Sequence, residues 1–182
     1  HEAFKTMRSR GTEVADIAVL VVAADEGVKP QTLEAIKIIQ EAETHFIVAL
    51  TKIDKPNANL DKVKNELTTA GVLLEGYGGQ VSYQPVSAKT GQGVDELLDL
   101  INLTAELENL TYDPEAPANG FILEAKLDSR RGMEVSAILK NGTLKKGQEI
   151  ATASARGKIK ILENFLGKTV DALQPSSPLR II

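Results

Sequence analysis

Two short polar stretches carry side chains that could bind a ligand. Thr51–Asp54 (Thr-Lys-Ile-Asp) closes an apolar run over residues 45–50, and Ser87–Lys89 (Ser-Ala-Lys) follows another short extended run. A charged, polar end on a buried parallel strand is the usual place for a ligand site in an α/β sheet. Because each stretch offers a lysine beside a hydrogen-bonding side chain, we expect them to form one pocket from adjacent strand ends.

The carboxylate of Asp54 is the group best suited to recognise a planar ligand. It could accept two parallel hydrogen bonds, which guanine offers through its N1–H and 2-amino groups and adenine does not. A site built on that pair rejects the analogue because the carboxylate is left unpaired. The alternative is a surface Lys and Asp at a turn, where such charges contribute little. The second polar stretch, about one βα unit downstream, favours the binding site.

Neighbouring residues have matching roles in this hypothesis. Lys52 can lay its aliphatic stem along one face of the base, and Lys89 can cover the other face. Ser87 can orient Asp54, and Ala88 can donate its backbone N–H to the guanine 6-oxygen. Together these groups predict a guanine-binding site.

A parallel α/β sheet is needed to bring these stretches together. Apolar, β-branched runs predict the strands, which cover residues 17–22, 46–50 and 82–87. Apolar residues at helical spacing predict the helices, with Leu33, Ile36 and Ile39 inward on the first, Leu60, Val63 and Leu67 marking the second, and Val94, Leu97, Leu98 and Ile101 the third. A further short helix is predicted over residues 2–10. Three alternations of strand and helix favour a parallel sheet with right-handed crossovers.

The pattern changes after a segment rich in proline. The predicted division is a domain over residues 1–112, a linker over 113–119 and a second domain over 120–182. In the second domain, apolar residues alternate with polar ones and predict five or six short strands, among them 121–127, 134–139, 148–152 and 158–162. Asn141–Gly142 predicts a hairpin turn between two of them. Such strands favour a small antiparallel β-barrel, closed to remove its edges.

The charge differs between the two parts of the chain. Residues 1–118 contain 10 Lys or Arg and 19 Asp or Glu, a net charge of −9, whereas residues 119–182 contain 11 and 6, a net charge of +5. A basic domain indicates contact with nucleic acid. The simpler interpretation is two differently solvated surfaces.

Composition excludes several kinds of site. The 182 residues contain no cysteine, which rules out a disulfide, a thiol nucleophile and a thiolate metal site. The two histidines, His1 and His45, are isolated from any nucleophile–base pair, and no metal site is predicted. We expect His45 to be a packed or surface residue rather than a catalytic one. No apolar run reaches ~18 residues, so no membrane span is predicted.

The motifs together resemble a known family. Thr51–Asp54 is similar to the Asn-Lys-x-Asp guanine motif of P-loop GTPases, and Ser87–Lys89 to their second base-binding motif. Stretches that resemble the bacterial-type translation initiation factor 2 family of translational GTPases cover residues 1–4, 7–11, 21–27, 30–36, 53–57, 78–79, 87–91 and 124–128. The resemblance therefore runs from the first residue into the last strands. It implies the C-terminal half of a P-loop GTPase domain followed by the β-barrel.

The resemblance also implies an activity and partners. The family binds GTP or GDP with Mg²⁺ and hydrolyses GTP while promoting initiator tRNA binding and ribosomal subunit joining. His1 matches the catalytic histidine that helps to place the attacking water, and the barrel matches a domain that faces small-subunit ribosomal RNA. The candidate phosphate contacts on the barrel are Arg130, Arg131, Lys145, Lys146, Arg156, Lys158 and Lys160. The implied location is the bacterial cytoplasm, with the mitochondrial matrix as the alternative.

The chain also departs from the family pattern. It contains no Gly-x-x-x-x-Gly-Lys-[Ser/Thr] motif, which cradles the phosphates and supplies the hydroxyl on Mg²⁺. Thr51 stands where the family has asparagine, which exchanges a two-donor amide for one hydroxyl. We therefore expect a fragment without the P-loop, the tRNA-binding domains or the last barrel strand, which binds no nucleotide tightly and has negligible GTPase activity. An exposed edge along residues 17–22 is expected to promote self-association.

Three alternatives remain open. The nearest is another translational GTPase of the elongation-factor type, which the tRNA-binding domains would distinguish. A second is a non-catalytic RNA- or protein-binding module that uses the barrel, for which RNA binding should depend on salt. The third is a nucleotide-independent α/β enzyme, for which the sequence offers no nucleophile beside a base.

Overall fold

The computed structural model describes residues 14–175 and 178–182. The chain divides into two compact units, unit 1 over His1–Leu110 and unit 2 over Thr111–Ile182. Each unit has a hydrophobic core of its own. Within the described residues, no helix is long and apolar enough to cross a membrane. The helix predicted over residues 2–10 lies outside the described part of the chain.

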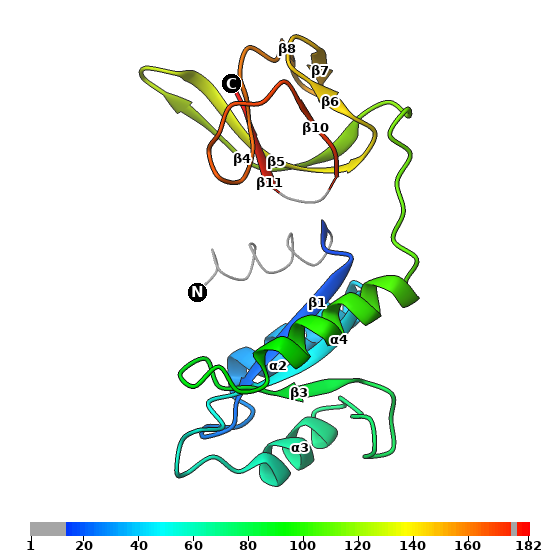
Figure 1. Cartoon of the computed structure of the whole chain (residues 1–182), viewed down its shortest axis with the longest axis vertical. Coiled ribbons are helices and arrows are strands. Elements are labelled where there is room, and N and C mark those ends of the chain that lie inside the picture. The colour runs from blue at the N-terminus through cyan, green and yellow to red at the C-terminus, as the bar shows by residue number, and fades with distance from the viewer. Residues whose placement is uncertain (1–13, 176–177) are drawn as a thin grey trace. The chain divides into compact units, whose positions relative to one another are not determined.

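Unit 1 contains a three-stranded parallel sheet (Figure 1). Its strands are β1 (Ile17–Ala23), β2 (His45–Thr51) and β3 (Tyr83–Pro85), in that order across the sheet. Ala23 pairs with Thr51 and Leu50 pairs with Pro85, so that all three strands end at the same edge. The third strand is shorter than the predicted residues 82–87.

Three helices follow the three strands. They are α2 (Pro30–Glu41), α3 (Leu60–Thr69) and α4 (Val94–Leu107). Pro30 begins α2 at a position where its missing N–H costs no helical hydrogen bond. The side chain of Asn59 caps α3 by accepting a hydrogen bond from the N–H of Lys62 at 3.0 Å. The predicted alternation of strand and helix is confirmed.

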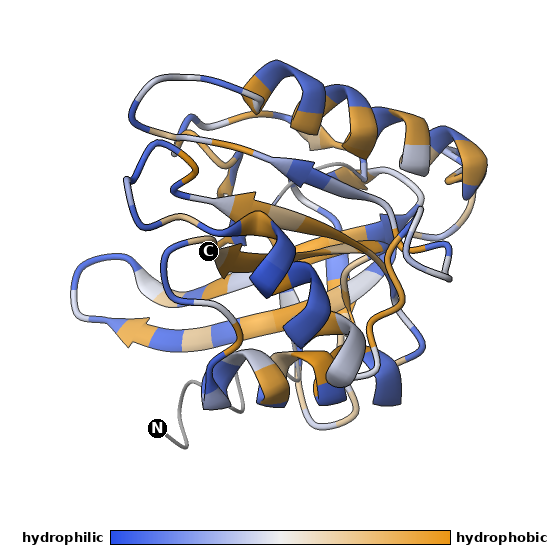
Figure 2. Ribbon diagram, turned by 90° about the horizontal axis from the view of Figure 1, so that it is seen from below, coloured by the Kyte–Doolittle hydropathy of each residue, from blue (hydrophilic) through white to orange (hydrophobic). Residues whose placement is uncertain are grey.

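The core of unit 1 lies between one face of the sheet and helices α2 and α3. Its buried residues include Leu20, Val22, Val48 and Leu50 from the strands and Ile36, Ile39, Val63 and Leu67 from the helices. Figure 2 shows hydrophobic strands beside helices along which hydrophobic and hydrophilic residues alternate. Strand β2 is buried on both faces, since Ile47 and Ala49 are 1% and 2% exposed. On β1, by contrast, Val19 and Val21 are 39% and 60% exposed.

The prediction that Leu33 points inward is wrong. Leu33 is 49% exposed, whereas Ile36 and Ile39 are 3% and 5% exposed. Helix α2 is turned about its axis so that Ala35 and Ile38, rather than Leu33, flank the buried stripe. Helical spacing places all of these residues near one face, but the neighbouring strands decide which flank is covered.

The apolar stripe of α4 is also covered only in part. Val94 and Leu98 are 36% and 53% exposed, and Leu97 and Ile101 are half-buried. The adjacent strand β3 has three residues and covers little of the helix. The helix forms as predicted, but one flank of its stripe faces solvent.

Unit 2 is an antiparallel β-barrel-like domain. Its strands are β4 (Asn119–Asp128), β5 (Gly132–Asn141), β6 (Leu144–Lys145), β7 (Glu149–Ala151), β8 (Arg156–Lys158), β9 (Leu162–Glu163), β10 (Ala172–Leu173) and β11 (Pro178–Ile181). They form one sheet in the order β4-β5-β11-β9 and two strand pairs, β6 with β10 and β7 with β8. Its core contains Leu139, Leu144, Ile159, Leu162, Leu179 and Ile181. The predicted fold class, a parallel α/β domain followed by an antiparallel barrel, is confirmed, with eight described strands in place of five or six.

The hairpin predicted at Asn141–Gly142 is wrong. Strand β5 before it pairs with β4 and β11, and strand β6 after it pairs with β10. The turn instead holds the segment that leads into β4: the side-chain oxygen of Asn141 accepts a hydrogen bond from Asp113 N–H at 2.7 Å, and Gly142 N–H donates to the Asp113 carbonyl at 3.1 Å. Gly142 has φ = 76°, and a Cβ there would lie 2.5 Å from the Ala116 carbonyl oxygen. The chain changes direction at Gly142 as predicted, but the two strands on either side of it do not pair with each other.

Candidate functional site

The two polar stretches lie side by side at the carboxyl edge of the unit 1 sheet. Backbone hydrogen bonds join the strand ends: Ala24 N–H donates to Thr51 O at 2.7 Å, and Val86 N–H donates to Leu50 O at 2.8 Å. Beyond the strands, Ile53 N–H donates to Val86 O at 3.4 Å. The parallel register therefore brings together Thr51–Asp54 and Ser87–Lys89, which are far apart in the sequence.

Ser87 connects the two stretches directly. Its hydroxyl donates a hydrogen bond to Asp54 Oδ1 at 2.6 Å, and its own Oγ accepts one from Thr90 N–H at 3.2 Å. Ser87 is fully buried, so its side chain has little freedom to leave this geometry. The Asp54 carboxylate therefore has a defined orientation before any ligand binds.

Asp54 is charged and accessible. The hydrogen bond from Ser87 lowers the pKa of Asp54 below its ordinary value of 3.8. Burial opposes this in part, and a backbone hydrogen bond and the nearby cations of Lys89 and Lys55 make smaller contributions that lower the pKa. Asp54 itself is exposed, as are Ala88 and Lys89 in the second stretch. A carboxylate with this protonation state and exposure can accept hydrogen bonds from two donors of a planar ligand.

Lys52 has partners that the sequence did not suggest. Its ammonium group lies 2.7 Å from Glu26 Oε1 and 3.5 Å from Asp25 Oδ1, both at the end of β1. The two acidic residues that follow the predicted strand over residues 17–22 could have indicated this pairing, because β1 ends at the same edge of the sheet as Thr51. Sequence reasoning assigned Asp25 and Glu26 no role.

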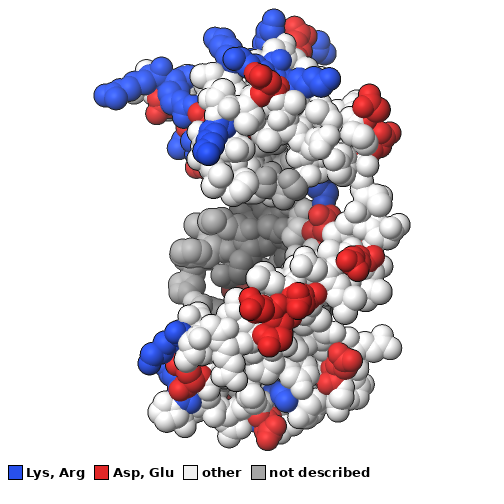
Figure 3. Space-filling view, in the orientation of Figure 1, with Lys and Arg blue, Asp and Glu red and all other residues white. Residues whose placement is uncertain are grey.

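The seven candidate basic residues of unit 2 do not form one uniform group. The Arg131 guanidinium contacts two buried carboxylates, Glu134 at 3.1 Å and Glu163. These carboxylates are 5% and 7% exposed, and Arg131 neutralises them together with Lys126 at Glu134 and Arg180 at Glu163. All seven residues are exposed, and the other six are Arg130, Lys145, Lys146, Arg156, Lys158 and Lys160. Figure 3 shows Lys and Arg gathered over unit 2 and acidic residues more frequent over unit 1.

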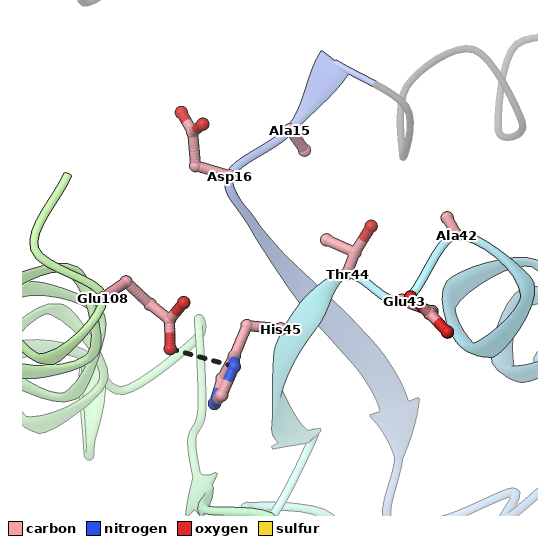
Figure 4. A pocket seen from close by; sticks show the side chains of 7 residues that line it. All are labelled: Ala15, Asp16, Ala42, Glu43, Thr44, His45 and Glu108. Carbon is pink, nitrogen blue, oxygen red and sulfur yellow. Dashed lines mark ion pairs between the residues drawn. The ribbon is translucent and has the colours of Figure 1, made fainter. Parts of the chain in front are cut away.

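His45 lies at the opposite edge of the sheet from the polar stretches. It begins β2, whose seven residues span roughly 20 Å, while Thr51 ends that strand. Its Nδ1 pairs with Glu108 Oε1 at 2.9 Å at the side of an open pocket with Asp16, Glu43 and Thr44 (Figure 4). This pocket is therefore separate from the candidate ligand site. His1 lies outside the described residues.

The described residues show no metal-binding cluster. Across residues 14–175 and 178–182, no group of three or more His, Cys, Asp or Glu side chains is arranged to hold a metal ion. The carboxyl edge offers an acceptor in the Asp54 carboxylate and donors in the Ala88 N–H and the Lys52 ammonium. The 182 residues contain no P-loop motif.

The fold is a parallel α/β domain with polar residues at its carboxyl edge, followed by a β-barrel-like domain. Such an edge is the usual ligand position in open α/β sheets. Residues 1–106 match the family described as elongation factor Tu GTP binding domain, and residues 117–182 match elongation factor G domain 2. The chain belongs to the translational GTPases, the family of the elongation factor Tu GTP binding domain.

Individual relatives carry more specific names. The chain is 50% identical over 182 residues to "Translation initiation factor IF-2" of Clostridium novyi, and 48% identical over 181 residues to the protein of that name from Staphylococcus epidermidis. The matches cover 100% of this chain but 27% and 25% of those proteins. The chain thus spans about a quarter of the length of these curated relatives.

Solved structures agree with the fold. GDP-bound aIF5B from Aeropyrum pernix has a TM-score of 0.79 and 28% identity, with 100% of this chain and 38% of that chain covered. Translation elongation factor SelB from Methanococcus maripaludis has a TM-score of 0.75 and 28% identity, with 93% of this chain and 37% of that chain covered.

Proposed function

We propose that this chain comprises the guanine-binding part of the GTPase domain and the second domain of a translation initiation factor. The whole protein would bind and hydrolyse GTP while promoting initiator tRNA binding and ribosomal subunit joining. The observation that carries the proposal is the Ser87–Asp54 hydrogen bond of 2.6 Å, which orients a charged carboxylate at the carboxyl edge of the sheet. The names of the relatives from Clostridium novyi and Staphylococcus epidermidis support the step from GTPase to initiation factor.

In this proposal the residues at the carboxyl edge of the sheet bind the guanine base. Asp54 accepts hydrogen bonds from guanine N1–H and the 2-amino group, and Ala88 N–H donates to the 6-oxygen. Lys52 and Lys89 cover the two faces, and Ser87 holds Asp54 in place. Thr51 contributes a hydroxyl at the end of β2. His1 is proposed as the catalytic histidine that helps to place the attacking water.

The domain division is proposed on the same basis. Residues 1–112 form a partial GTP-binding domain, residues 113–119 a connecting segment, and residues 120–182 the barrel domain. The connecting segment carries its own contacts, since Thr143 Oγ1 donates a hydrogen bond to the Pro114 carbonyl at 2.9 Å. GTP or GDP with Mg²⁺ is the cofactor of the whole protein, and its location is the bacterial cytoplasm, or the mitochondrial matrix if the protein is an organellar relative.

Titration of the 182-residue chain with GMP tests the base site. We expect GMP, but not AMP, to shift the amide NMR signals of Asp54, Ser87 and Ala88, because the two nucleotides share a phosphate and differ in the base. The affinity should be weak, and Mg²⁺·GTP should show no turnover, because phosphate and Mg²⁺ contacts carry most of the affinity and catalysis in this class. Equal responses to GMP and AMP would contradict guanine recognition, and micromolar GTP binding or turnover would contradict the predicted weakness.

The barrel is proposed to contact small-subunit ribosomal RNA, while initiator tRNA would bind other domains of the whole protein. Replacing the exposed Arg130 with methionine is expected to weaken binding of that RNA and to reduce the slope of log K against log salt by about 1, because one phosphate contact is lost. The thermal midpoint of unfolding should stay the same. Lys168→Met is a matched control, since Lys168 is exposed but is not a candidate contact.

Arg131→Met is expected to behave differently from Arg130→Met. Loss of the Arg131 cation leaves Glu134 and Glu163 buried without their shared partner, which should lower the thermal midpoint by several degrees. RNA affinity of the folded protein should change little. If Arg131→Met instead reduced the salt slope without affecting stability, the assignment of Arg131 as the partner of these buried carboxylates would be wrong.

A second copy of the chain is the partner proposed for the free edge of β1. Among the described residues, β1 pairs with β2 alone, and Val21 on it is 60% exposed. Self-association measured by light scattering should fall in Val21→Lys and persist in Leu103→Lys, a change at a 53% exposed position on α4. A monomer at every concentration would overturn this proposal.

Two other functions have observations in their favour. The likeness to SelB supports an elongation-type translational GTPase, and binding of initiator against elongator tRNA by the whole protein distinguishes it. The exposed basic residues of unit 2 support a non-catalytic RNA-binding module. That alternative predicts salt-dependent RNA binding with no response of unit 1 to GMP.

A further inference from the structure

A network of four charged side chains joins the ends of β1 and β2. Asp25 and Glu26 follow β1, and Lys52 and Lys55 follow β2. Lys55 Nζ lies 2.8 Å from Asp25 Oδ2, while Lys52 Nζ lies 2.7 Å from Glu26 Oε1 and 3.5 Å from Asp25 Oδ1. One carboxylate thus serves both lysines that flank the Ile53–Asp54 dipeptide.

The backbone of Lys52 is in an unfavourable conformation. Its φ is +60°, in the left-handed region that residues with a Cβ rarely adopt. Among the described residues, Glu43 and Asn109 are the other non-glycine residues with positive φ. Such a conformation persists when the surroundings over-determine it, and an observed outlier of this kind is a reason to look for function. The Lys52 carbonyl accepts a hydrogen bond from Lys55 N–H at 3.1 Å, and the Lys52 ammonium makes two ion pairs that restrain the side chain.

Asp25 is a fixed anchor, whereas Glu26 is a peripheral one. The side chain of Asp25 is 5% exposed, and that of Glu26 is 49% exposed. Asp25 Oδ1 is buried without a hydrogen-bond partner, and the Lys52 ammonium lies 3.5 Å from it, while Lys55 pairs with the other oxygen of the same carboxylate at 2.8 Å. The hydrogen bond from Lys55 lowers the pKa of Asp25, which keeps this anchor ionised at neutral pH.

We infer that Asp25, assisted by Glu26, is a positioning residue of the guanine site. It holds Lys52 in the left-handed conformation, with the ammonium drawn toward the end of β1 and the aliphatic stem available to lie along the base. The inference rests on the proposed guanine recognition by Asp54 and adds the groups that prepare the lysine beside it. Asp25 and Glu26 themselves make no contact with the base.

The test compares Asp25→Asn with the unsubstituted chain and with Asp99→Asn. Asp99 is exposed on α4, so its replacement removes the same charge without touching the site. The first readout is the three-bond HN–Hα coupling of Lys52, which reports its φ directly. The second is the affinity for GMP, with AMP as the comparison. The amide signals of Asp54 and Ser87 show whether the other half of the site stays intact.

In Asp25→Asn we expect Lys52 to lose its positive φ while the Ser87–Asp54 hydrogen bond persists. GMP affinity should fall by about tenfold if the prepared conformation drops to about a tenth of the population. Glu26→Gln, at an exposed position that folding should tolerate, should reduce GMP affinity by a smaller factor of about two to three. The affinity for AMP and the behaviour of Asp99→Asn should stay unchanged.

Three results would overturn the inference. An unchanged Lys52 coupling in Asp25→Asn and Glu26→Gln would show that these carboxylates do not hold the lysine. A changed coupling with an unchanged GMP affinity would leave them as a purely structural clamp between two strand ends. Absence of any GMP response in the unsubstituted chain would be a failure of the proposed function, and the inference would fall with it.

Discussion

Replacing Asp54 with asparagine is expected to reverse the preference between GMP and XMP. Xanthine keeps the N1–H of guanine but has a carbonyl in place of the 2-amino group. The Asp54 carboxylate repels that carbonyl, whereas the asparagine amide can donate to it and still accept from N1–H. The substitution removes a charge-assisted hydrogen bond to GMP and replaces a repulsion of XMP with a hydrogen bond. The ratio of GMP to XMP affinity should therefore fall by about 100-fold or more.

The measurement is an NMR titration of the unsubstituted chain and of Asp54→Asn, each with GMP and with XMP. Ser87 can still donate to the remaining oxygen at position 54, so the orientation seen at 2.6 Å should survive the change. Asp61→Asn is the control, because Asp61 is exposed in the first turn of α3 and its change removes the same charge. A GMP to XMP ratio that does not move in Asp54→Asn would exclude Asp54 as the group that recognises the base.

Leu67→Ala is expected to destabilise unit 1 by about 2–5 kcal/mol, the usual range when a fully buried leucine is truncated. Leu67 is 0% exposed, and it packs in the cluster that joins α3 to the sheet and α2. Every described helix lies in unit 1, so the circular dichroism signal at 222 nm during urea unfolding follows this unit. The midpoint urea concentration should fall without a large change in slope.

Leu33→Ala provides the matched control on α2. Leu33 is 49% exposed, and its truncation should change stability by about 0.5 kcal/mol or less. A large loss in Leu33→Ala would mean that this leucine is covered in solution, as helical spacing alone predicted. Equal effects of Leu33→Ala and Leu67→Ala would contradict the core described for unit 1.

Periodicity identified the elements of this protein but not the faces they bury. The strands and helices of unit 1 were predictable because apolar spacing is a local property of ten or so residues. Which flank of α2 is covered depends on the strands beside it, and the structure buries Ile38 at 9% exposure rather than Leu33. The same reason explains why Leu98 on α4 stays exposed although its spacing matches the stripe.

The position of a turn was also predictable from the sequence, but the strand pairing around it was not. The chain does bend at Gly142, where φ = 76°. Strand pairing is not local, however, and β6 pairs with β10, which lies more than twenty residues further along the chain. The hairpin that joins β4 to β5 depends instead on Asp128, whose carboxylate accepts hydrogen bonds from Arg130 N–H and Arg131 N–H at 2.8 Å each.

Local sequence patterns were sufficient to predict the fold class of this protein and the two stretches that form its candidate site. Thr51–Asp54 and Ser87–Lys89 end apolar strands, and parallel strands must end at one edge, so their proximity followed from local patterns. The tertiary structure decided the partner of each charged side chain. Ser87 and Asp54 are 33 residues apart, Lys52 and Glu26 are 26 apart, and Arg131 and Glu163 are 32 apart. Such pairings depend on distances that arise only after the strands have taken their order and register, so they are not written in any local pattern.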